Sequence, residues 1–159
     1  MMGPEINMMM TKSLDYKDIT SKLDKKNDVI TIIGCNDCIR IGGAGGPVKL
    51  KELAMKLKAD GYNVKEGFLL PIACMEPYLF TITLSHEVNT AIVLSCSAGW
   101  SNVKRNYPHL KVIQTVEDLG LMPGDADRGT LKLNMPYKKY NALKSCEFVM
   151  GSDGQKIEK

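Results

Sequence analysis

Three short runs of apolar residues each end at a cysteine, and this placement constrains the fold more than any other feature of the chain. Val29–Gly34 leads into Cys35, Gly67–Ala73 into Cys74, and Ala91–Ser95 into Cys96. Runs of this length and composition are typical of buried β-strands. In an open parallel sheet, the carboxyl ends of neighbouring strands converge on one crevice. We therefore expect these cysteines to gather at one edge of a sheet.

Helical patterns separate the predicted strands. Pro47 suits the first turn of a helix, where its missing N–H costs nothing, and the apolar spacing that follows predicts a helix to about Ala59. Asp60-Gly61 then ends it, because glycine tolerates the left-handed conformation after a helix. Further helical segments are expected over residues 76–84, 98–106 and 116–119.

The alternation of strand and helix predicts an α/β fold: a single flavodoxin-like or Rossmann-like three-layer domain. Its parallel sheet would have about four strands, at 29–33, 62–70, 89–94 and 111–114, in the spatial order 2-1-3-4. Residues 29–122 would form this domain. Residues 1–28 are interpreted as an N-terminal extension, and the turn-rich residues 123–159 as an irregular tail that packs on the domain or on a partner.

Composition excludes several classes of protein. The 159 residues are 44% hydrophobic and 25% charged with a net charge of +3, which suits a globular domain and is too mild a charge to imply nucleic acid. No segment approaches the ~18 to 20 apolar residues of a membrane span. Because residues 1–10 lack the pattern of a secretory signal, we expect a cytoplasmic protein whose thiols stay reduced.

The cysteines therefore point to metal, catalysis or core packing rather than to disulfides. Four of them, Cys35, Cys38, Cys74 and Cys96, follow three strands that the expected order makes neighbours, about 5 Å apart. A tetrathiolate set of this kind suits an iron–sulfur cluster, [4Fe–4S], or zinc. A redox-active dithiol at the C-x-x-C is a third interpretation, although such a pair usually begins a helix and here the glycine loop intervenes before the predicted helix. Cys146 is interpreted as structural or free.

The glycine loop that follows the first strand has two interpretations. Its glycines could let the backbone fold closely around a cluster and donate N–H groups to its sulfurs, with Arg40 and Lys49 offsetting the cluster's charge. A nucleotide-binding loop is the alternative, because amides at a helix N-terminus bind phosphate. The loop matches neither the dinucleotide nor the P-loop spacing. The candidate cofactor-binding residues are Gly42, Gly43, Gly45 and Gly46.

A small-ligand enzyme with a cysteine nucleophile is a further alternative. The segment around Cys96 is similar to a strand-to-helix nucleophile turn but lacks the glycine two residues earlier, and Cys74 is the other candidate. The only histidines, His86 and His109, lie in no recognisable base motif.

Residues 33–53, beginning Ile-Gly-Cys-Asn-Asp-Cys-Ile-Arg and continuing through the glycine loop, resemble the methylenetetrahydrofolate reductase C-terminal-like domain. Pro71–Cys74 and Leu94–Gly99 resemble later cysteine positions of that family, so that the similarity covers roughly residues 29–120. The third cysteine of the family's opening motif falls on Gly42, and most tail cysteines are absent around Cys146.

The resemblance implies a small iron–sulfur partner of a flavin-bearing reductase from anaerobic one-carbon metabolism. On this interpretation the chain is a non-catalytic electron-transfer or scaffold subunit of an oxidoreductase complex, with Cys35, Cys38, Cys74 and Cys96 as ligands. The alternative is a structural zinc module that docks on a larger enzyme.

Overall fold

A computed structural model describes residues 8–125 and 130–149 of the chain. Its centre is a four-stranded parallel sheet with the order β3-β2-β4-β5, so the predicted α/β class with a parallel sheet of four strands is confirmed. The strands are β2 (Val29–Cys35), β3 (Asn63–Leu70), β4 (Thr90–Leu94) and β5 (Lys111–Gln114).

Burial along these strands follows their place in the sheet. All five residues of β4 are buried, as are the last six of β2, because central parallel strands are covered on both faces. The edge strand β3 alternates between exposed and half-buried residues until Leu70, which is buried. The prediction of buried strands from apolar runs therefore holds for β2 and β4 and fails for most of β3.

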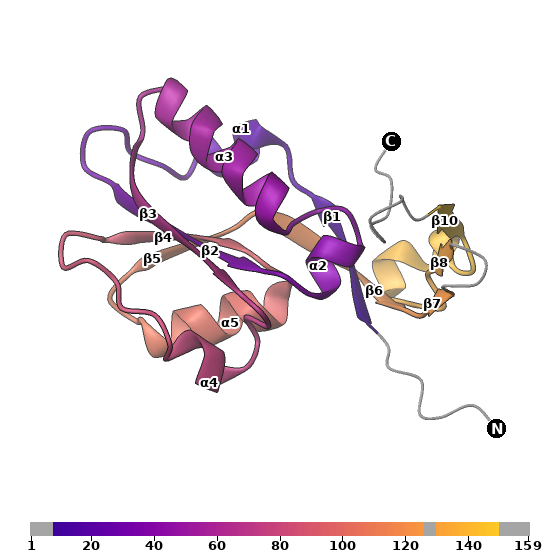
Figure 1. Ribbon diagram of the computed structural model, residues 1–159. Helices are drawn as coiled ribbons and strands as arrows, with labels where there is room; N and C mark the ends of the chain where they lie inside the picture. Colours follow the sequence, from indigo (N-terminus) through magenta and orange to yellow (C-terminus); the bar gives the residue numbers. More distant parts are fainter. Residues whose placement is uncertain (1–7, 126–129, 150–159) are drawn as a thin grey trace.

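Helices cover both faces of the parallel sheet (Figure 1). On one face lie α3 (Pro47–Ala59) and the short α1 (Tyr16–Thr20), and on the other α4 (Glu76–Leu79) and α5 (Ser97–Asn106). Residues 80–84, predicted to continue α4, are not helical. The hydroxyl of Thr81 donates instead to the carbonyl of Tyr78, at 2.6 Å. Among the described residues, no helix has the length and apolar character needed to cross a membrane.

Segments from before and after the parallel sheet form an antiparallel sheet with the order β1-β6-β9. β1 (Met8–Ser13) pairs with β6 (Val116–Met122), which also pairs with β9 (Met135–Pro136). The prediction of a helical turn over residues 116–119 was wrong, because this segment is extended by its pairing with β1. Met10 is fully buried there, so part of the segment interpreted as an extension belongs to the core.

The described part of residues 123–149 contains more regular structure than an irregular tail. A third sheet has the order β10-β8-β7, formed by Glu147–Val149, Thr130–Lys132 and Gly124–Asp125. The 3-10 helix η1 (Lys138–Leu143) lies beside it. A separate apolar cluster joins this region to β1 and β6; its buried members are Met10, Leu119, Met122, Leu131 and Leu133.

Candidate functional site

The carboxyl edge of the parallel sheet brings three cysteine-bearing segments together. Cys35 is the last residue of β2 and faces Leu70, the last residue of β3, in the ladder. On the other side of β2, Gly34 faces Leu94, the last residue of β4. Cys74 follows Leu70 by four residues and Cys96 follows Leu94 by two, so both continue from the same edge.

The four cysteines have different surroundings at this edge. Cys35 is buried, with 7% of its surface exposed, and belongs to the core cluster on the α5 side of the sheet. Cys38 is half-buried and begins the short helix α2 (Cys38–Ile41). Cys74 is exposed in the loop before α4, and Cys96 is the half-buried N-cap residue of α5. The sequence argument that placed the C-x-x-C away from any helix was therefore wrong.

The cysteine thiols lie within electrostatic reach of one another. Burial is the main cause that raises the pKa of Cys35, and negative charge on Cys96 or Cys74 raises it further. Burial likewise raises the pKa of Cys38 and of Cys74, and each also responds to charge on Cys96 and on another member of the group. Every pair among the four interacts in this way, so they form one electrostatic group.

Backbone amides oppose this effect of burial. The N–H of Ala73 donates to the sulfur of Cys35 at 3.4 Å, and the amide of Asp37 also lowers the pKa of Cys35. The amide of Met9, on β1, does the same for Cys38. Amide donors to sulfur stabilise a thiolate, which is the form that binds metal. The sequence contains no signal for the amides of Ala73 and Met9, because only the fold brings these segments to the cysteines.

The loop between Cys35 and Cys38 has one unsatisfied polar atom. The side-chain oxygen Oδ1 of Asn36 is buried and has no hydrogen-bond partner among the described residues. The Nε of Arg40 donates to the backbone carbonyl of Asn36 at 3.1 Å and so fixes the loop to α2. Arg40 therefore holds the backbone beside the cysteines, while the buried side-chain oxygen of Asn36 is left without a partner among the described residues.

The glycine loop ends α2 and packs it closely against neighbouring side chains. The amides of Gly42 and Gly43 donate to the carbonyls of Cys38 and Arg40. A Cβ on Gly45 would lie 2.7 Å from Ile39, and a Cβ on Gly46, whose φ is +89°, would lie 2.7 Å from Arg40. These glycines are needed because α2 packs closely against the start of α3.

Four thiols are ligands that a soft metal prefers, but in this structure they do not converge on one point. Within residues 8–125 and 130–149, no three Cys, His, Asp or Glu side chains are arranged to hold an ion. A cysteine sulfur can move by rotation about one side-chain bond, so ligation needs at least a change of rotamer. The edge therefore supplies four neighbouring thiols, and ligation would require their reorientation.

Other candidate residues lie elsewhere. Cys146 lies in the C-terminal region, where its carbonyl accepts from Leu133. Both histidines line a cavity with Val88 and Leu110, next to the amino ends of β4 and β5, so the length of β4, about 16 Å, separates them from Cys96. No imidazole is therefore placed to activate Cys96 as a nucleophile.

Comparison of the chain with family models, with curated proteins and with solved structures returned no match.

Proposed function

We propose that the chain is a metal-binding, non-catalytic subunit whose four edge cysteines hold a [4Fe–4S] cluster. The gathering of Cys35, Cys38, Cys74 and Cys96 at the carboxyl edge of one sheet is the observation that carries the proposal. A cluster bound there would supply one-electron transfer. The chain's own part is to provide four thiolates and the amides that stabilise them.

The protonation of the thiols makes metal loading depend on pH. Because burial raises the pKa of Cys35, Cys38 and Cys74 above the ordinary value of 9.0, these thiols hold their protons at neutral pH in the metal-free protein. Metal must displace those protons, so loading releases acid and weakens as the pH falls.

A flavoprotein reductase, or a larger oxidoreductase complex of one-carbon metabolism, is the partner we propose. Exposed apolar side chains support an interface: Met75, next to exposed Cys74, is 46% exposed, Leu69 in β3 is 39% exposed, and Phe80 after α4 is 64% exposed. Among the described strands, β3 pairs only with β2, so its other edge is open. A cytoplasmic location and a flavodoxin-like three-layer arrangement belong to the same proposal.

The decisive experiment is metal and sulfide analysis, with visible and EPR spectra, on full-length protein purified without oxygen. We expect about four irons and matching sulfide per chain, as a [4Fe–4S] cluster requires. Serine substitutions of Cys35, Cys38, Cys74 and Cys96 should each remove most of the iron. Cys146→Ser is the matched control and should leave the metal content unchanged.

Other outcomes would redirect the proposal. One zinc per chain and no iron would assign the same cysteines to a structural zinc module that docks on a larger enzyme. A metal-free protein whose serine variants behave like the wild type would overturn metal binding altogether. A reversible Cys35–Cys38 disulfide in that protein would favour the redox dithiol.

The geometry argues against a nucleophilic enzyme. Reactive cysteines have a lowered pKa, whereas burial raises the pKa of Cys74. Cys96 has no histidine within reach, as described above.

A further inference from the structure

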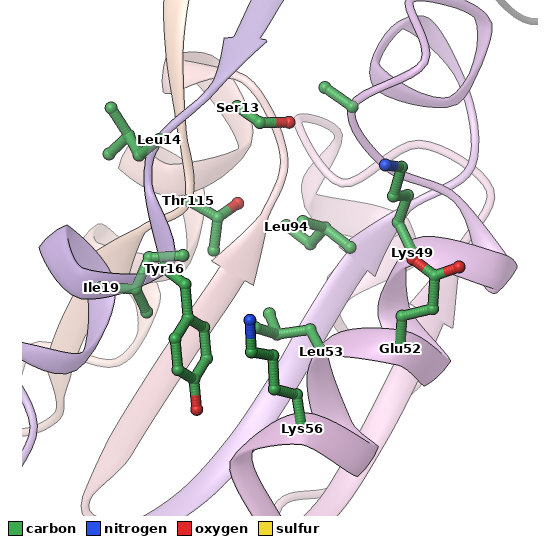
Figure 2. Close-up of a pocket in the computed structure, with 11 residues that line it drawn as sticks. Ser13, Leu14, Tyr16, Ile19, Lys49, Glu52, Leu53, Lys56, Leu94 and Thr115 are labelled. Atoms are coloured by element: carbon green, nitrogen blue, oxygen red, sulfur yellow. The ribbon is translucent and has the colours of Figure 1, made fainter. Parts of the chain in front are cut away.

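A cavity of about 200 Å³ lies on the α3 face of the sheet, between α3 and the segment that joins β1 to α1 (Figure 2). Leu94 and Thr115, at the carboxyl ends of β4 and β5, form its floor. In Figure 2 the side chains of Lys49, Leu53 and Lys56 extend from α3 on one side, with Tyr16 on the other. None of the four edge cysteines lines this cavity.

The cavity exists because the two helices on this face differ in length. α3 has 13 residues, whereas α1 has five and buries only Ile19. Ile19 packs with Ile92 and Ile113 lower on the same face of the sheet. Toward the carboxyl ends of the strands no comparable helix continues from α1 within the described residues. Ligands of open α/β sheets usually bind at these ends.

The outer wall of the cavity is held in place by two contacts of Tyr16. Its hydroxyl donates to Oδ2 of Asp60 at 2.6 Å, and the ammonium of Lys56 lies 4.1 Å from the centre of its ring. Burial, followed by the bond to Asp60, raises the pKa of Tyr16 well above its usual range, so the hydroxyl stays a donor. A wall fixed in this way leaves little conformational entropy for a ligand to overcome.

The lining combines an apolar floor with an excess of positive charge. Leu53 and Leu94 offer apolar surface, while Lys49 and Lys56 contribute two ammonium groups against the single carboxylate of Glu52. Lys49 also lies in the first turn of α3, where the helix dipole favours negative charge.

We propose that this cavity binds a small monocarboxylate with a compact apolar body, such as a single ring. The volume suits this class, because an apolar cavity of roughly 150 Å³ can hold one benzene molecule. The ring would lie against Leu53 and Leu94, and the carboxylate would accept hydrogen bonds from Lys49 and Lys56 at the rim. Binding does not require metal at the cysteines.

The test is saturation-transfer NMR on the full-length protein, with benzoate as the probe and uncharged, isosteric benzamide as its control. We expect saturable binding of benzoate and at least roughly fivefold weaker binding of benzamide, because the lysines recognise the charge. Lys49→Gln combined with Lys56→Gln should weaken benzoate binding by a similar factor. Glu52→Gln should tighten it, since the one carboxylate among the lining residues is then neutral.

The matched control is Lys51→Gln combined with Lys58→Gln, which removes the same two charges seven residues apart on α3 but outside the cavity lining. It should change benzoate affinity by less than about twofold. The proposal is overturned if benzoate does not bind, if benzamide binds equally well, or if both lysine pairs have the same effect. Thermal unfolding of each variant checks that its fold is intact.

Discussion

The parallel sheet and the antiparallel segments beside it are organised over very different distances along the chain. β2 to β5 lie within residues 29–114 and are joined by successive helical crossovers. β1 and β6 instead pair opposite ends of that stretch, with Met8 facing Met122. The parallel sheet is buried between helices on both faces, whereas the antiparallel region depends on a small cluster around Met10 and Leu131.

The candidate site depends on both the parallel sheet and the antiparallel segments. The parallel sheet positions Cys35, Cys74 and Cys96 at one edge, while β1 brings the amide of Met9 to Cys38. The antiparallel segment β6 also supplies Asp118, whose carboxylate accepts from the backbone and hydroxyl of Ser97 at the start of α5. Substitutions in each region should therefore show which contacts stabilise the core and which hold the cysteine edge in place.

The largest effect is expected for Ile92→Ala in β4. Ile92 is fully buried on the face of the sheet that α3 covers. The substitution therefore leaves a cavity and should lower the free energy of unfolding by about 3 kcal/mol. Urea unfolding of metal-free protein measures this. Val48→Ala, on exposed α3 surface, should change stability by less than about 0.5 kcal/mol. Equal losses in the two variants would contradict the burial of this sheet.

A smaller but still large loss is expected for Gly120→Ala in β6. Its φ is +145°, and a Cβ there would lie 2.3 Å from the backbone oxygen of Met135, so β6 and β9 would have to separate. We expect roughly 2 kcal/mol from strain and lost pairing. Gly61→Ala has a positive φ but open space around it, and should cost about 1 kcal/mol. Amide hydrogen exchange measures the loss of pairing between β6 and β9. Because Pro136 has no amide hydrogen, we expect the faster exchange at Leu121 and Tyr137.

Asp118→Ala tests the link between the two regions. Loss of its bonds to Ser97 removes the side-chain support at the first turn of α5 and should cost about 1 kcal/mol. Because Cys96 precedes this turn, the alkylation rate of Cys96 should change as well. Glu117→Ala, which removes an exposed ion pair with Lys139 and a side-chain bond with Tyr140, should leave both measurements nearly unchanged. A variant that alkylates like the wild type would show that β6 does not support the cysteine edge.

The pH dependence of the metal-free protein is the smallest expected effect. Burial raises the pKa of Cys35, Cys38 and Cys74 in the folded state, so folding favours the protonated thiols. Their contribution to stability is complete below the unfolded value of about 9 and is lost as the pH rises through the raised folded values. Urea midpoints between pH 7 and pH 10 measure the loss. Cys35→Ser should flatten the curve; a slope unchanged from the wild type would argue against this linkage.

Much of the parallel sheet could be predicted because its signals are local. The β-branched runs of β2 and β4 and the Pro47 and Gly61 boundaries of α3 each occur within a few residues. The strand at 116–122 was missed because its pairing with β1 comes from a distant segment, and strand propensity depends strongly on such context. The packing role of Gly45 and Gly46 was missed for the same reason.

By itself, the sequence determined the α/β class, the four parallel strands and the position of three cysteines at the end of a strand or within four residues after it. Hydrophobic periodicity and helix boundaries are properties of neighbouring residues. Only the tertiary structure decided what surrounds those cysteines. Amides from Ala73 and Met9, the helix that begins at Cys38, and the cavity between α1 and α3 all arise where separate segments meet. Contacts of that kind depend on three-dimensional packing, which a local pattern does not specify.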